Sequence, residues 1–187
     1  MPKEIELKVI NVDKKEVESR LRELGAKHVA THKFRRVVFE TGHGSKIKNL
    51  RIRTDGKVCT MTLKERTGPG LDQTYEYEVE VSDFDTAAKI LCKYIKSKPI
   101  YELNTREEYM LGGVQITIDK WPGIPYYVEI EGLSVAAIKD MYKKLAIKGK
   151  LIGNVPHGSV YSTYYNIDYA KVIEKNNKKL GAILGKE

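Results

Sequence analysis

Short segments in which charged and apolar side chains alternate recur along the 187 residues of this chain. The first segment reads Glu-Ile-Glu-Leu-Lys-Val from Glu4 to Val9. Because successive side chains of a strand point to opposite faces, Glu4, Glu6 and Lys8 share one face and three aliphatic side chains share the other. One such strand is typical of an ordinary solvated sheet surface. The pattern constrains the fold because it returns in most of the later predicted strands.

The later strands also carry sorted charges. In the segment 50–54, Arg51 and Arg53 share one face, and the Asp-Gly pair that follows predicts a hairpin. The return strand over 57–64 ends on Lys64. The other predicted strands are 34–40; 75–81, with Glu76, Glu78 and Glu80 on one face; 104–110, with Arg106 and Glu108; 114–119, which ends on Asp119; and 126–131, with Glu129 and Glu131.

Three segments have the apolar spacing of amphipathic helices, at about 14–24, 85–96 and 135–148. Their apolar sides need a partner, and the apolar faces of the strands provide one. If helices cover those faces, the charged faces point the other way, and hairpins that close on themselves enclose a polar interior. The predicted fold is α+β: an eight-stranded antiparallel β tunnel or barrel with amphipathic helices packed outside.

Length and composition predict one domain over residues 1–170 and a lysine-rich C-terminal tail over 171–187. The chain contains no run of about 18 apolar residues, so no membrane span is predicted. The N-terminus has no signal-peptide pattern. Cys59 and Cys92 lie far apart without metal-site spacing, which favours a reduced, cytoplasmic protein. The net charge of +8 indicates either a solvated basic surface or an anionic partner.

A charged interior predicts a highly charged ligand, because buried charge is costly unless it is paired or bound. Arginine and lysine suit phosphate oxygens, and carboxylates suit Mg²⁺ or Mn²⁺. Basic groups for phosphates together with acids for a divalent metal are typical of phosphoryl transfer. The candidate phosphate ligands are Arg51, Arg53, Lys64 and Arg106, and the candidate metal ligands are Glu4, Glu6, Asp119, Glu129 and Glu131.

The remaining polar and aromatic residues are mostly expected to be solvated or to pack, without a part in catalysis. Glu80 and Glu108 are expected at strand ends in water, and Trp121 is expected to pack in its own turn. The Tyr-rich segment 159–165 is expected to form a packed lid. The four histidines are scattered and are expected at the surface or at helix ends, with His157 as the candidate for reaching the tunnel mouth.

The segment from Glu4 to Lys8 resembles the N-terminal ExExK signature of CYTH domains, also called triphosphate tunnel metalloenzymes. The resemblance covers about residues 1–165. In the second strand many members carry an Asp before an aromatic pair, whereas this chain reads Arg-Arg-Val-Val-Phe over 35–39. The later motifs follow the family's order: Arg51 and Arg53, Thr62 and Lys64, Glu76 and Glu78, Arg106 before a Gly-Gly pair, Asp119 before Trp-Pro-Gly-Ile-Pro, and Glu129 with Glu131.

The resemblance implies a tunnel that binds a triphosphate and a divalent metal, Mg²⁺ or Mn²⁺. It assigns a catalytic role to Glu4 and Glu6 as metal ligands and to Lys8, which would polarise a bridging oxygen of the substrate. The full metal set that it implies is Glu4, Glu6, Glu129 and Glu131, with Asp119 close by and Glu76 or Glu78 completing it. The phosphate set that it implies is Lys8, Arg51, Arg53, Lys64 and Arg106.

Family members include inorganic triphosphatases, thiamine triphosphatases, class IV adenylyl cyclases and RNA triphosphatases. The leading hypothesis is a metal-dependent hydrolase of tripolyphosphate or of an organic or nucleoside triphosphate. A class IV adenylyl cyclase needs the same ligands, so the sequence does not separate the two enzymes. A non-catalytic module that binds polyphosphate or RNA 5′-triphosphate ends is the third hypothesis, and a homodimer stays open.

Overall fold

The computed structural model describes residues 3–43, 46–68 and 70–184, which form ten strands and five helices. The helices are α1 (Lys14–Glu23), α2 (Phe84–Tyr94), α3 (Val135–Leu145), α4 (His157–Tyr165) and α5 (Tyr169–Leu184). The strands are β1 (Lys3–Glu4), β2 (Glu6–Ile10), β3 (Lys27–His43), β4 (Lys46–Thr54), β5 (Cys59–Arg66), β6 (Thr74–Glu80), β7 (Ile100–Leu111), β8 (Val114–Lys120), β9 (Tyr127–Glu131) and β10 (Lys150–Gly153).

All ten strands belong to one antiparallel sheet, in the order β1-β6-β5-β4-β3-β7-β8-β9-β2-β10. β1 and β2 are consecutive pieces of the N-terminal strand, separated only by Ile5. Because β1 pairs with β6 and β2 pairs with β9, the N-terminal strand joins the two ends of the sheet and closes it. The closure at β6 is short in the described part of the chain, where Lys3 and Glu4 pair with Tyr75 and Thr74.

The predicted α+β fold with a closed antiparallel sheet is confirmed, but the number of strands is ten instead of eight. The N-terminal strand counts twice because it is interrupted at Ile5. β10 adds to the free side of β2, in a segment that is not among the predicted strands. β3 extends to His43 and β4 begins at Lys46, so both strands are longer than the predicted segments 34–40 and 50–54.

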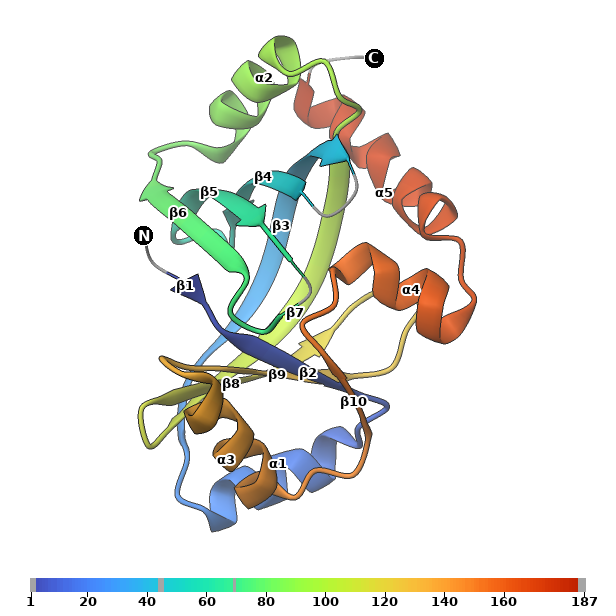
Figure 1. Cartoon of the computed structure of the whole chain (residues 1–187). Coiled ribbons are helices and arrows are strands. Elements are labelled where there is room, and N and C mark those ends of the chain that lie inside the picture. The colour runs from blue at the N-terminus through green and yellow to red at the C-terminus, as the bar shows by residue number, and fades with distance from the viewer. Residues whose placement is uncertain (1–2, 44–45, 69, 185–187) are drawn as a thin grey trace.

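The helices cover the outside of the sheet in two groups, at opposite ends of the molecule in Figure 1. α1 and α3 pack on β2, β8 and β9, whereas α2 and α5 pack on β3, β4 and β7. α4 covers a third cluster that contains Trp121 and Tyr127. The three predicted helices begin where a side chain can accept the N–H of a first-turn residue, namely at Asp13, Asp83 and Ser134.

Strand alternation decides which side chains face the interior. In β2, Leu7 and Val9 are almost fully buried in the core beneath α1 and α3. Glu6 and Lys8 point the other way and line the internal cavity. The predicted division of this strand into an apolar outer face and a charged inner face is therefore confirmed, and it places charged groups inside a closed sheet.

The lysine-rich segment after residue 170 is a helix where it is described, and not a tail. Leu180 of α5 is 4% exposed in the core shared with α2. The Asn177 side chain accepts the N–H of Tyr101 at 2.8 Å and donates to the Pro99 carbonyl at 3.3 Å. Apolar residues at helical spacing, such as Val172 and Leu180, pack this segment against the domain despite its lysines.

Residues 185–187 lie outside the described part. No described helix is long and apolar enough to cross a membrane.

Candidate active site

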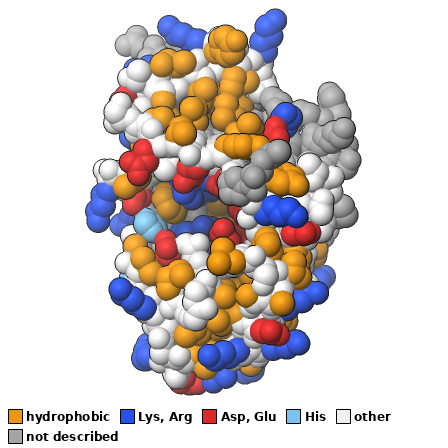
Figure 2. Space-filling view, turned by 60° about the vertical axis from the view of Figure 1, so that its left-hand side comes forward, with side chains coloured by type: hydrophobic (Ala, Val, Ile, Leu, Met, Phe, Trp, Pro, Cys, Tyr) orange, Lys and Arg blue, Asp and Glu red, His pale blue; other side chains and the backbone are white. Residues whose placement is uncertain are grey.

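The inner faces of the strands enclose a cavity of about 870 Å³. In Figure 2 it appears as a hollow between two apolar halves, with acidic and basic side chains at its mouth. Among the predicted site residues only Asp119 does not line it, because Asp119 is 0% exposed and lies within the wall. The predicted residues that line it are Glu4, Glu6, Lys8, Arg51, Arg53, Lys64, Glu76, Glu78, Arg106, Glu129 and Glu131.

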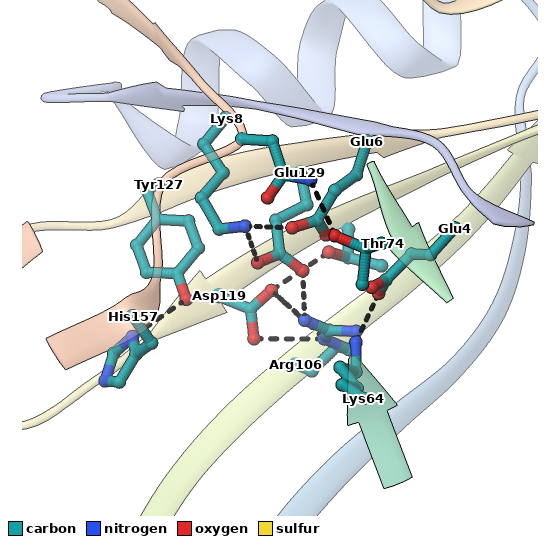
Figure 3. Close-up of polar contacts among 12 residues, drawn as sticks. Glu4, Glu6, Lys8, Lys64, Thr74, Arg106, Asp119, Tyr127, Glu129 and His157 are labelled. Carbon is teal, nitrogen blue, oxygen red and sulfur yellow. Dashed lines mark hydrogen bonds and ion pairs between the residues drawn. The ribbon is translucent and has the colours of Figure 1, made fainter. Parts of the chain in front are cut away.

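Two lysines hold the carboxylates of different strands together (Figure 3). Lys8 pairs with Glu6 and lies 3.3 Å from Glu129 Oε1. Burial disfavours the charged form of Lys8, but Glu6 and Glu129 outweigh burial and raise its pKa. Lys64 pairs with Glu4 and with a carboxylate of β6, at 3.2 Å. The lysines therefore neutralise acids that come from four different strands.

The carboxylates crowd one another even with both lysines present. Burial, followed by the charge of Glu4, raises the pKa of Glu131 to about 7. Glu6 and Glu129 add to this effect, and Lys64 opposes it. Hard oxygen donors gathered in this way have the chemistry that Mg²⁺ and Mn²⁺ prefer. Among the described residues no three His, Cys, Asp or Glu side chains form a ready-made metal site. Glu6 and Glu4 pair with lysines.

Arg106 connects the buried wall to the cavity. Its Nε atom lies 3.0 Å from both oxygens of Asp119, and its Nη2 atom donates to Glu129. Asp119 also accepts hydrogen bonds from Asn104 at 2.8 Å and Thr117 at 2.9 Å. The metal role of Asp119 stays a prediction, but in this arrangement its carboxylate fixes the direction of the Arg106 guanidinium.

Four guanidinium groups gather beside the acids, from Arg36, Arg51, Arg53 and Arg106. Burial, followed by Arg51 and Arg36, lowers the pKa of Arg53 to about 9. Burial and then Arg51 lower the pKa of Arg36 to about 10. Arg51 lies 3.6 Å from Glu76, which is its nearest carboxylate partner. Like charges held this close indicate a site for an anion.

Sequence reasoning missed Arg36, which lies opposite Arg53 in the pairing of β3 and β4. The signal was available, because alternation in this strand places Phe34, Arg36 and Val38 on one face. Arg66 was missed as well, and it donates to the Asn154 carbonyl at 2.7 Å at the cavity wall.

His32 and Glu108 differ from their expected positions. His32 lines the cavity and lies 2.9 Å from Asp55 and 3.3 Å from Glu108. The expectation that Glu108 lies at a strand end is therefore wrong, whereas Glu80 is exposed at the end of β6 as expected. His157 also lines the cavity, at 3.5 Å between ring centroids from the buried Trp121.

The chain belongs to the CYTH domain family, whose profile matches residues 2–156. A conserved hypothetical protein from Pyrococcus furiosus is similar in structure, with 25% identity, a TM-score of 0.71, and coverage of 81% of this chain and 96% of that one. The PH1012 protein from Pyrococcus horikoshii OT3 is similar at 23% identity and a TM-score of 0.72, with the same coverage.

HpAC1 from Hippeastrum, for which a dominant triphosphatase activity is described, is similar at 16% identity and a TM-score of 0.55, with coverage of 86% and 95%. A search of curated proteins found no match. The family and the closed sheet together identify the cavity as the tunnel of a CYTH domain.

Proposed function

We propose that the protein is a divalent-metal-dependent hydrolase of triphosphates, with inorganic tripolyphosphate as its preferred substrate. The observation that carries this proposal is the coexistence of crowded carboxylates and crowded guanidiniums in one tunnel. Burial and neighbouring like charges disfavour the charged forms of Glu131 and Arg53, and a bound ion of opposite charge would relieve this cost. A polyphosphate with its metal provides both ions in one ligand.

In the proposed complex the two lysines exchange partners. Lys8 and Lys64 turn from carboxylates to phosphate oxygens, together with Arg51, Arg53 and Arg106. This exchange frees the metal-binding carboxylates, for which we propose Glu4, Glu6, Glu129 and Glu131. When bound there, Mg²⁺ or Mn²⁺ supplies neutralisation of phosphate charge and activation of water.

The chain's own residues then position the reacting groups. Arg106, held by Asp119, fixes a phosphate relative to the carboxylates. A water oxygen bonds to the terminal phosphorus, the bond from that phosphorus to the bridging oxygen breaks, and the water proton passes to a carboxylate. Lys8 stabilises the negative charge that develops on the bridging oxygen. The products are orthophosphate and diphosphate.

The tunnel's aromatic rings favour a substrate without a base. His32 stacks on Phe34 at 4.8 Å between centroids, and the Arg53 guanidinium lies 4.5 Å from the same ring. Trp121 contacts His157 at 3.5 Å and the Arg36 guanidinium at 4.6 Å. An adenine would have to displace these partners before it could stack. The adenylyl cyclase hypothesis therefore has less support than hydrolysis of an all-phosphate chain.

Glu6→Gln, measured beside Glu23→Gln, tests the enzyme against a pure binding module. Glu23 lies on the exposed surface of α1 and makes the same charge change outside the tunnel. Glu6→Gln is expected to lower kcat for tripolyphosphate by about a hundredfold or more while calorimetric binding of tripolyphosphate persists. Unchanged turnover in Glu6→Gln would contradict the proposal, as would cyclic AMP and diphosphate as the main products from ATP in chromatography.

A further inference from the structure

Three buried nitrogen atoms at one end of the tunnel have no hydrogen-bond partner among the described residues. They are Arg36 Nε, Trp121 Nε1 and His157 Nε2. Arg36 is 6% exposed and Trp121 is 4% exposed, yet all three residues line the tunnel. Buried polar groups are almost always hydrogen-bonded, so three orphaned atoms in one place indicate a missing acceptor.

These atoms belong to one contiguous group. The Arg36 guanidinium lies 4.6 Å from the Trp121 ring, and the His157 ring lies 3.5 Å from the same ring. Tyr127 Oη lies 3.5 Å from His157 Nδ1, as Figure 3 shows. When this hydroxyl donates to Nδ1, the ring proton stays on Nε2, so that all three nitrogen atoms are N–H donors.

The group also lacks a carboxylate to serve as its acceptor. Among the described residues Arg36 has no ion pair within 4 Å, and its Nη2 atom donates to the neutral Asn104. The two acids whose charges act on Arg36 are engaged elsewhere, since Glu102 accepts from Tyr169 and Asp119 is held by Arg106. The acceptor that fits three N–H donors and one positive charge is an oxyanion.

The start of α4 adds to this preference. His157 is the first residue of the helix, and Val155 to Gly158 line the tunnel. Pro156, at the N-cap, makes no side-chain hydrogen bond to the first turn. The N–H groups and the dipole at a helix N-terminus favour a negative charge close to Arg36 and Trp121.

We propose that Arg36, Trp121 and His157 form a phosphate subsite beyond those that hold a triphosphate. Tyr127, beside the subsite, and Glu131, among the carboxylates, are four residues apart in β9, about 13 Å along an extended strand. The phosphate oxyanion comes either from the far end of a linear polyphosphate longer than three units or from released orthophosphate. This proposal rests on the proposed function for both sources, since the first needs a polyphosphate in the tunnel and the second needs hydrolysis to release orthophosphate.

The chain's single tryptophan provides a direct readout, because all tryptophan emission comes from Trp121. Orthophosphate, tripolyphosphate and tetrapolyphosphate are titrated separately into metal-free protein while this emission is recorded. Arg36→Gln is compared with Arg35→Gln, which removes the same charge from the outer face of β3, where Arg35 pairs with Asp85. The proposal predicts an emission change with orthophosphate and an affinity about tenfold or more weaker in Arg36→Gln alone.

Two arms of the experiment separate the two sources. If the subsite holds the end of a long chain, tetrapolyphosphate binds more tightly than tripolyphosphate, and Arg36→Gln removes the difference. If it holds released phosphate, the two chains bind alike and Arg36→Gln weakens only orthophosphate. Calorimetry of Trp121→Phe, which keeps a ring but removes the N–H group, gives the same pattern if Arg36→Gln does not fold.

The subsite would be overturned if orthophosphate, tripolyphosphate and tetrapolyphosphate each bound equally well to wild type, Arg36→Gln and Trp121→Phe. Because these titrations need no turnover, the two proposals fail separately. A phosphate response that depends on Arg36 in a protein without hydrolytic activity would preserve the subsite and refute the hydrolase. Metal-dependent hydrolysis with no role for Arg36 or Trp121 in phosphate binding would preserve the hydrolase and refute the subsite.

Discussion

Replacing Arg106 with Met tests how the buried wall supports the tunnel. The substitution removes the guanidinium from Asp119, which is 0% exposed, and leaves that carboxylate with only Asn104 and Thr117 as donors. Breaking a buried ion pair on one side costs about 3–5 kcal/mol. Since two donors remain, we expect the free energy of unfolding to fall by about 3 kcal/mol, at the lower end of that range.

The matched variant Asp119→Asn keeps the shape of the side chain and leaves Arg106 bound to Glu129. It is expected to cost less, about 1–2 kcal/mol, as for the loss of a charge-assisted hydrogen bond. The double variant buries no unpaired charge at position 119, so its loss is expected to be smaller than the sum of the two single losses by about 2 kcal/mol.

Urea denaturation at neutral pH in metal-free buffer measures all three variants. The reasoning is refuted if the losses add within about 0.5 kcal/mol, because that is the behaviour of independent sites. It is equally refuted if Arg106→Met is as stable as wild type, since a fully buried carboxylate would then tolerate the loss of its main partner.

Three further predictions concern stability. Hydrogen bonds from the Val58 N–H, the His32 ring and the Lys57 N–H hold the pKa of Asp55 below its ordinary value. A carboxyl with a lowered folded pKa stabilises the fold above its unfolded pKa and loses this effect as pH falls through the folded value. The loss in free energy of unfolding caused by Asp55→Ala, measured by urea denaturation, should therefore be largest at neutral pH and shrink in acid. A loss that grows in acid would contradict the prediction. Leu180→Ala should lower the free energy of unfolding by about 2–5 kcal/mol, whereas a free tail predicts no change. Gly149→Ala should cost about 1–3 kcal/mol in thermal or urea unfolding, because its Cβ would lie 2.7 Å from a backbone oxygen; wild-type stability would show that this segment shifts without strain.

The alternation of side chains was enough to predict the inner and outer faces of the strands. In β9, Glu129 and Glu131 face the tunnel while Val128 and Ile130 are fully buried in the core. The choice is forced because a one-residue shift would place two carboxylates in the core and two aliphatic side chains in the tunnel. The polar faces of the other strands follow for the same reason.

Depth within the wall could not be predicted in this way. Asp119 and Arg106 lie on inner faces of neighbouring strands, and alternation gives them equal access to the cavity. Their cross-strand pairing places Arg106 in front and Asp119 behind it, and this order depends on register and side-chain length. The sequence therefore could not predict that Asp119 lies behind Arg106, and its role as a metal ligand stays a prediction.

The position of Arg36 in the site and the packing of the C-terminal helix depend on long-range contacts, so they could not be predicted from the local sequence. Arg36 joins the site because β3 pairs with both β4 and β7, which brings it opposite Arg53 and Glu102. The sequence segment alone reads as two adjacent arginines that depart from the family pattern. In α5 the lysines dominate the composition, and the burial of Leu180 depends on where the helix meets α2 and β7.

Phosphorus NMR of tripolyphosphate incubated with the protein, with and without Mg²⁺ or Mn²⁺, tests the central claim most directly. The arrangement of carboxylates, lysines and arginines in one tunnel predicts that tripolyphosphate is converted to equal amounts of orthophosphate and diphosphate only when a divalent metal is present. Unchanged tripolyphosphate with both metals, or equal conversion in their absence, would contradict it.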